Sequence, residues 1–195
     1  MVTGPTATAA PNEALFDAVV SNQAVQCRML LRETSEASLN AASPNHGGMT
    51  CLALAANAGS TEIVRLLVQH AADVNVTAPE CRDFTPLMFA AHHLHLEAAQ
   101  ALIRADASLE AKSARGETAL SIVLCGRQCC SSCKSLRSAV VCCILDAMRE
   151  RHEKKRRAAR WRQENGWESG GEKPQMHPRH KRRRLRALSL ATEMR

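Results

Sequence analysis

The chain has 195 residues, of which 45% are apolar and only 3% aromatic, with no Tyr. This length suits one modest domain with an appendage, and the aliphatic composition favours closely packed helices over a sheet sandwich. Residues 1–148 carry 10 Lys/Arg and 13 Asp/Glu, whereas residues 149–195 carry 16 and 6, so the net charges are −3 and +10. The basic character belongs to the last quarter, which indicates an appended arm for an acidic partner or a targeting signal.

Residues 1–11 lack the basic start and the long apolar centre of a secretory signal, and we expect them to be disordered. The longest apolar stretch, residues 139–145, is far shorter than the roughly 20 residues of a membrane-spanning helix. The nine Cys include two adjacent pairs. Without a secretory signal, reduced thiols in the cytosol or nucleus are expected.

Three segments repeat along the chain, at residues 48–56, 83–91 and 116–124, and each carries a Thr at its third position. These Thr residues, Thr50, Thr85 and Thr118, are 35 and 33 positions apart. A second apolar block follows at residues 63–67 and 98–102, and a third block closes units at residues 37–40, 72–75 and 107–110. Such self-similarity is typical of a repeat architecture.

Each unit makes physical sense as two helices and a hairpin loop. The Thr caps the first helix, because its hydroxyl accepts a backbone N–H. Pro86 falls in the first helical turn, where its missing N–H costs nothing. Gly59 ends one helix and Thr61 begins the next. A single pair cannot bury its own apolar face, so stacking of units is expected.

The units resemble ankyrin repeats, whose pattern T-P-L-H-x-A-A is similar to residues 85–91 with Met88 in place of His. The resemblance implies an all-α solenoid of stacked helix–turn–helix units with short hairpin loops over residues 12–148. Its units are expected near 12–46, 47–81, 82–114 and 115–148. The first is degenerate, with Leu30 and Leu31 standing where Leu66 and Leu67 stand later.

Several positions depart from the family pattern. Leu94 and Arg127 fall where the family has Gly between the helices, and Asp106 falls where a Gly ends the second helix. Asp tolerates the left-handed conformation better than most residues. In the fourth unit the apolar block at residues 140–145 comes later than the period requires, so we expect an insertion over residues 128–136 if that block is the second helix.

The resemblance implies that a partner protein docks on the concave side, formed by hairpin tips and first helices. Mapped by position, this side includes Met49, Arg82, Phe84, Arg115 and Glu117 at the tips, and Leu54, Asn57, Phe89, His92 and Ile122 on the helices. Exposed Phe84 and Phe89 would be apolar anchors of the kind that interfaces use. The alternative for Phe89 is that it fills a gap between repeats.

Two clusters invite a metal hypothesis. His92, His93 and His95 are close in sequence, but neighbours on a helix point in different directions, so a structural or surface role is favoured. The resemblance also implies a His that bonds to backbone near this turn. A second cluster is made of Cys125, Cys129, Cys130 and Cys133. One short loop rarely encloses zinc without a second knuckle, so a plain insertion loop is favoured over zinc, redox or lipid modification.

The tail contains two basic clusters, Lys154-Lys155-Arg156-Arg157 and Lys181-Arg182-Arg183-Arg184. The first continues a helix from Val140, because no breaker precedes Gly166. The second follows a linker rich in Gly and Pro, which we expect to be disordered. Such runs are typical of nuclear localisation signals or nucleic-acid patches. Trp161 and Trp167 could stack on bases or cover the last repeat, and a solvated tail without function is a third option.

Signatures of enzymes, such as a Gly-rich phosphate loop or a G-x-S-x-G motif, do not occur in the sequence. We therefore expect a monomeric adaptor or scaffold in the nucleus or cytoplasm, without catalysis, cofactor or metal. The alternative is a nucleic-acid-binding or chromatin-associated protein that acts through its basic tail. A metal or redox regulator using the Cys cluster is a weaker option. The sequence does not name the partner.

Overall fold

The computed structural model describes residues 11–34, 39–125 and 131–164, with the backbone alone at residues 11–12 and 131–133. The named elements of this part are α1 (Pro11–Val20), α2 (Ala24–Leu30), the 3₁₀ turn η1 (Pro44–His46), α4 (Cys51–Ala58), α5 (Thr61–Gln69), the 3₁₀ turn η2 (Pro79–Cys81), α6 (Pro86–His92), α7 (Leu96–Arg104), α8 (Ala119–Cys125) and α9 (Ser131–Glu164). The chain divides into two compact units, one ending at Arg149 and the other beginning at Glu150.

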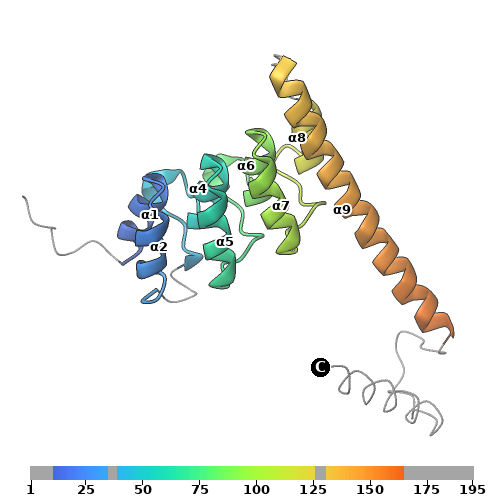
Figure 1. The fold of residues 1–195 in the computed structure, drawn as a ribbon, viewed down its shortest axis with the longest axis horizontal. Helices are drawn as coiled ribbons and strands as arrows, with labels where there is room; N and C mark the ends of the chain where they lie inside the picture. The colour runs from blue at the N-terminus through green and yellow to red at the C-terminus, as the bar shows by residue number, and fades with distance from the viewer. Residues whose placement is uncertain (1–10, 35–38, 126–130, 165–195) are drawn as a thin grey trace, which may run out of the picture. The chain divides into compact units, whose positions relative to one another are not determined.

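The first unit is built from helix pairs stacked side by side. α1 pairs with α2, α4 with α5, and α6 with α7. α1, α4, α6 and α8 follow one another in one layer, because each contacts the next, and α2, α5 and α7 form a second layer (Figure 1). These two layers confirm the predicted solenoid of helix–turn–helix units.

The first helices begin at the Thr residues that the repeat predicts. The hydroxyl of Thr50 accepts the Ala53 N–H at 3.2 Å, and the hydroxyl of Thr85 accepts the Met88 N–H at 3.4 Å. At the start of α8, Thr118 and Ser121 each accept the backbone N–H of the other. The Thr118 hydroxyl accepts the Ser121 N–H at 3.3 Å, and the Ser121 hydroxyl accepts the Thr118 N–H at 2.8 Å. Two N–H groups that a helix start leaves unpaired are satisfied in this way.

The turns between helices use the left-handed backbone even without glycine. Gly59 ends α4 with φ 73°, and Leu94 occupies the same position after α6 with φ 60°. Asp106, after α7, has φ 65°, as expected from the tolerance of Asp for this region. The turn geometry of the stack is therefore imposed on residues that do not prefer it.

One apolar core runs through the stack from Leu15 to Ile144. Alanines on the first helices, including Ala55 and Ala90, are fully buried, because small side chains let neighbouring helices approach closely. Leucines such as Leu67 fill the remaining space. Aliphatic packing of this kind explains how a chain with so few aromatic residues forms a core.

Hydrogen bonds join successive repeats at matching positions. The side-chain oxygen of Asn40 accepts the Asp73 N–H at 2.8 Å, and that of Asn75 accepts the Ser108 N–H at 2.7 Å, in both cases across 33 residues. At the turn after α6, the His95 Nε2 lies 3.2 Å from the Asn57 carbonyl oxygen. The predicted backbone bond of a His near this turn is thus made by His95.

The fourth repeat differs from its prediction. α9 begins at Ser131, so residues 131–136 of the expected insertion are helical and do not form a loop. The physical reason is that no Gly or Pro interrupts the chain from Ser131 to Glu164. Residues 126–130 lie outside the described part, together with Arg127.

α9 contributes to the core through only one of its faces. Val140 and Ile144 are fully buried, which confirms that the apolar block packs as a helix. Cys143 is half-buried, whereas Cys142 is exposed. At about 100° per residue, Cys142 is turned roughly 200° from Val140 and therefore points away from the core.

Among the described residues, no helix is both long enough and apolar enough to cross a bilayer. α9 is the longest of the named helices, with 34 residues, and its mean hydropathy is negative because charged side chains fill its second half.

Candidate protein-interaction surface

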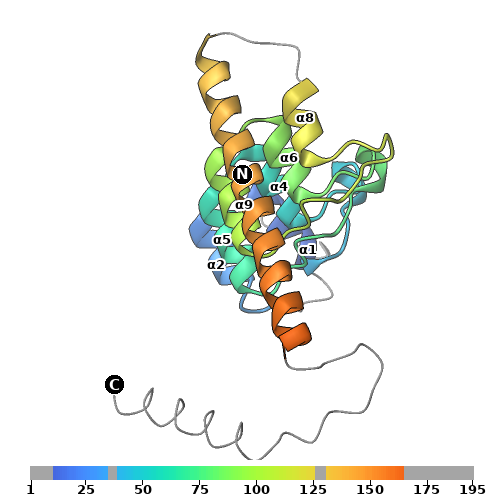
Figure 2. The same cartoon turned by 90° about the vertical axis from the view of Figure 1, so that its right-hand side faces the viewer.

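The first two hairpin tips share one backbone design. In the first tip, η1 is followed by Gly47 and Gly48. The Ser43 N–H donates to the Met49 carbonyl, and the Ser43 carbonyl accepts the Gly48 N–H, both at 3.0 Å. In the second tip, Ala78 makes the same two bonds, to Phe84 and Asp83, again at 3.0 Å. The hairpins project on one side of the stack, away from α2 and α5 (Figure 2).

The third tip is two residues shorter than the others. The Ser113 N–H donates to the Glu117 carbonyl at 2.9 Å, and the Gly116 N–H donates back to the Ser113 carbonyl at 2.8 Å. The Ser113 hydroxyl accepts the N–H groups of Arg115 and Glu117 at 3.3 and 3.2 Å. Arg115 is therefore presented at the apex of a hydrogen-bonded loop.

Neighbouring tips also bind to each other. The Cys81 thiol lies 3.4 Å from the Gly47 carbonyl oxygen, and the Ala114 N–H donates to the Arg82 carbonyl at 2.9 Å. Because each tip is tied to the next, the side chains at their apices are held in fixed relative positions. A partner that binds such a preorganised surface loses less entropy in ordering it.

The structure separates the predicted binding residues into accessible and buried groups. Arg82, His92 and Arg115 are exposed, and Met49, Asn57 and Glu117 are half-buried; we call these six residues the tip surface. Leu54, Phe84, Phe89 and Ile122 are only 7–8% exposed. The expectation that Phe84 and Phe89 are exposed apolar anchors is therefore wrong.

The two Phe residues are buried because they pack against each other. Their ring centroids are 5.4 Å apart in an edge-to-face arrangement, and the ring of His92 lies 6.4 Å from that of Phe84. Phe84 comes from the second tip and Phe89 from α6, so this pair joins the hairpin to its helix. This contact lies within one repeat, so the alternative that Phe89 fills a gap between repeats stays a prediction.

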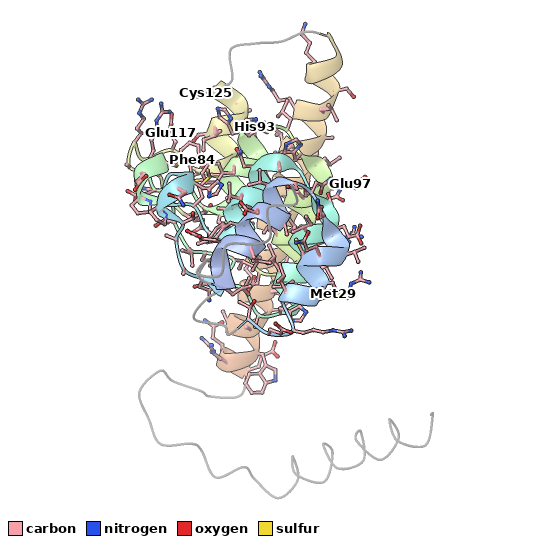
Figure 3. All side chains as sticks on the ribbon, turned by 90° about the vertical axis from the view of Figure 1, so that its left-hand side faces the viewer. Met29, Phe84, His93, Glu97, Glu117 and Cys125 are labelled. Atoms are coloured by element: carbon pink, nitrogen blue, oxygen red, sulfur yellow. The ribbon has the colours of Figure 1, made fainter. Side chains whose placement is uncertain are left out.

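The tip surface faces one side of the stack. In Figure 3, Phe84 and Glu117 lie on the hairpin side, whereas Glu97 lies on the opposite side with the second helices. Sequence reasoning did not select Glu80, Asp83 and Lys112, which also lie on or beside the tips and are exposed or half-buried. Their position in the hairpin loops is the sequence feature that could have identified them. The accessible surface is thus polar and mixed in charge.

The three histidines near the end of α6 form a row of rings. The centroid of His93 lies 4.7 Å from that of His92 and 5.9 Å from that of His95. Burial lowers the pKa of His93, and repulsion from His92 and His95 lowers it further. Within residues 11–34, 39–125 and 131–164, no group of three or more His, Cys, Asp or Glu is placed to hold a metal ion.

The predicted Cys cluster is only partly visible. Cys125 is exposed at the end of α8. Cys129 and Cys130 lie outside the described residues, and only the backbone is described at Cys133. The hypotheses of zinc binding or redox chemistry for this cluster therefore stay predictions.

The first basic cluster lies on α9. Lys154, Lys155, Arg156 and Arg157 are all exposed, and they belong to a continuous helix, as the absence of a breaker predicts. The second cluster, Lys181, Arg182, Arg183 and Arg184, and Trp167 lie outside the described residues. Trp161 is 52% exposed on the same helix.

Stacked helix pairs with linked hairpin tips define a helical-repeat protein. More particularly, residues 51–103 match the model of the family described as ankyrin repeats (many copies), which is consistent with the predicted repeats over this stretch. The match covers α4 to most of α7. A search of curated proteins found no match to this chain. Ankyrin repeats generally mediate protein–protein interaction and are not themselves catalytic modules.

Proposed function

We propose that this chain is an adaptor or scaffold that binds another protein through the tip surface. The observation that carries the proposal is the backbone of the second tip. Arg82 and Asp83 have φ values of 63° and 56°, where the first tip has Gly47 and Gly48. For Arg82 this conformation costs roughly 1–2 kcal/mol, whereas Asp tolerates it better than most residues. Strain of this kind concentrates at functional sites, so it supports a role for the side chains at this tip.

The chemistry of the tip surface favours a partner with acidic or carbonyl acceptors. Arg82 and Arg115 present exposed guanidinium groups on adjacent tips, and a guanidinium matches carboxylates with two parallel hydrogen bonds. Met49 adds an adaptable apolar contact. Because the large apolar side chains are inside, binding here depends on geometry and charge more than on an apolar anchor.

A pair of matched variants tests the tip surface. Arg82→Ala with Arg115→Ala removes two cations from the tips, and Arg65→Ala with Arg104→Ala removes two exposed cations from α5 and α7. Proteins captured by the tagged full chain should be lost with the tip variant and kept with the control. With a purified partner, the tip variant should bind at least tenfold more weakly, since hot-spot truncations cost about 1–2 kcal/mol or more. Equal loss in both variants would refute the proposal.

Substitution of Phe84 and Phe89 is not a suitable test of binding. Both rings are buried, and truncation of a buried Phe costs about 3–5 kcal/mol of stability. Loss of partner binding in such a variant would report unfolding of the tip. The exposed arginines avoid this ambiguity.

A second candidate function is nucleic-acid binding through the basic segment of residues 149–195. It is favoured by α9, on which every side chain from His152 to Glu164 is exposed while Lys and Arg outnumber Glu. Lys and Arg that neutralise phosphates release counterions, so binding should weaken steeply with added salt. Absence of any salt-sensitive binding by the purified chain would remove this candidate.

The same segment supports a proposal of nuclear localisation. Lys154 to Arg157 are exposed and so accessible to an import receptor. A tagged chain ending at Arg149 should leave the nucleus, whereas the full chain should accumulate there. An unchanged distribution would refute the targeting role and leave the adaptor proposal intact.

A further inference from the structure

The stretch of α9 from Glu150 to Glu164 has an uneven distribution of charge. It contains seven Lys/Arg and three Glu, which leaves a net charge of +4. All thirteen side chains from His152 to Glu164 are exposed, so every side of the helix is accessible over this length. The positions of the charges around the helix can therefore decide what the stretch binds.

All three carboxylates lie on one side of the helix. Glu150, Glu153, Arg157, Trp161 and Glu164 follow each other at intervals of 3, 4, 4 and 3, which places them in a single stripe. Contact between the Arg157 guanidinium and the Glu153 carboxylate at 3.4 Å agrees with this placement. We call these five residues the acidic stripe.

The other cations form two flanks, one on each side of the acidic stripe. At about 100° per residue, the half-buried Arg151 lies with Lys155 and Arg162 on the first flank, and Lys154 lies between this flank and the acidic stripe. Arg156 and Arg160 form the second flank. Between the flanks, on the side turned away from the acidic stripe, lies an uncharged strip. Its members are His152, Ala159 and Gln163.

We propose that this stretch of α9 binds double-stranded DNA by lying in the major groove. The groove is about 12 Å wide and admits one α-helix, with a phosphate backbone along each wall. In this position the uncharged strip faces the base edges and the two flanks face the two backbones. The acidic stripe then faces solvent, away from the phosphates. The inference rests on the proposed nucleic-acid function and names its ligand.

Other polyanions fit this arrangement less well. A helix that lies on a lipid surface needs an apolar face, but the only large apolar side chain here is Trp161, which lies in the acidic stripe. Duplex RNA has a deep and narrow major groove that side chains do not enter. An acidic protein surface would meet one flank and leave the other unused.

Two neighbouring arginines provide a matched test. Arg156→Gln and Arg157→Gln remove the same charge from the same residue type, but only Arg156 lies on a flank. Binding of the full chain to a short DNA duplex is followed by fluorescence anisotropy over a range of salt concentrations. Arg156→Gln should bind several-fold more weakly and reduce the slope of log K against log salt by about 0.9, the value for one phosphate contact. Arg157→Gln should leave the slope unchanged.

A stronger variant extends the test. Lys155→Gln, Arg156→Gln and Arg162→Gln together should lower the slope by about 2.7, while thermal unfolding of the repeats stays as in the unmodified chain. Equal slopes for Arg156→Gln and Arg157→Gln, whether both altered or both unaltered, would overturn the groove arrangement. If the unmodified chain shows no salt-sensitive binding to DNA or to RNA, the nucleic-acid function itself fails. Binding to RNA alone would overturn only the assignment of duplex DNA.

Comparison ligands separate DNA from the alternatives. Duplex RNA of the same sequence, the single DNA strand and anionic phospholipid vesicles should each bind more weakly than the DNA duplex under the same conditions. Equal or tighter binding to any of them would overturn the assignment of duplex DNA as the ligand.

Discussion

At the scale of single residues, Gly59 packs closely against His95 of the next repeat. The left-handed backbone of Gly59, with φ 73°, disfavours any other residue. A Cβ atom at this position would also lie 2.6 Å from the His95 Nδ1. His95 is in turn held by its contact with the Asn57 carbonyl oxygen. The sequence alone indicated a Gly at this turn between helices, but it did not indicate the close approach of His95.

Gly59→Ala should destabilise the chain more than Gly116→Ala. Gly116 has φ 75° but no atom within 4 Å of its notional Cβ, so its substitution costs only the backbone penalty of roughly 1–2 kcal/mol. At Gly59 the clash with His95 should add about 1–3 kcal/mol. Urea unfolding measures both. His95→Ala in the Gly59→Ala background should recover part of the loss, and equal costs at the two glycines would contradict this account.

Cys51 should make stability depend on pH in the alkaline range. Burial, together with the neighbouring Cys27, raises the pKa of this thiol from its ordinary value of 9.0 to about 12. The folded state keeps the thiol neutral while the unfolded state ionises, so the stabilisation is present below pH 9 and is lost between pH 9 and 12. As the pH rises above 9, the unfolding free energy of the Cys51→Ala variant should fall less steeply than that of the unmodified chain. Parallel slopes would argue against a buried neutral thiol.

At the scale of elements, contacts between residues close in the sequence could be predicted, and contacts between distant residues could not. The caps at Thr50 and Thr85 follow from side chains three residues from their partners, so the repeat alone located them. The bond from Asn75 to Ser108 joins positions 33 residues apart. The pattern of spacing showed that such blocks recur, but not that their side chains meet.

Asn75→Ala should lower the free energy of unfolding by about 0.5–1.5 kcal/mol, because the Ser108 N–H loses its acceptor. Asn75→Asp keeps a side-chain oxygen at the same place and should remain close to the unmodified chain. Chemical denaturation of both variants provides the comparison. A similar loss in the two would indicate that the hydrogen bond is not what the Asn contributes.

At the scale of the whole molecule, the core and the exposed basic helix are carried by different parts of the chain. Among the described residues, the buried apolar side chains end at Ile144, before the second unit begins. Residues 152–164 contribute no buried side chain. The sequence anticipated this division through its change in charge near residue 149.

A chain that ends at Arg149 should therefore unfold at nearly the same denaturant concentration as the full chain. A chain that ends at Cys125 loses the fully buried Val140 and Ile144, and should be destabilised by about 2–5 kcal/mol. Circular dichroism melts of the three lengths check this expectation. Strong destabilisation of the Arg149 chain would show that the second unit supports the repeats.

The sequence by itself determined the repeat, the helix pairs, their caps and the charged stretch of α9, because these follow from hydrophobic spacing and from contacts within a few residues. Only the tertiary structure decided which of the predicted binding residues are accessible. Phe84 and Phe89 were expected outside, yet their rings pack together at 5.4 Å. Exposure depends on what a folded hairpin and its neighbouring helix cover, and a one-dimensional pattern does not contain that information.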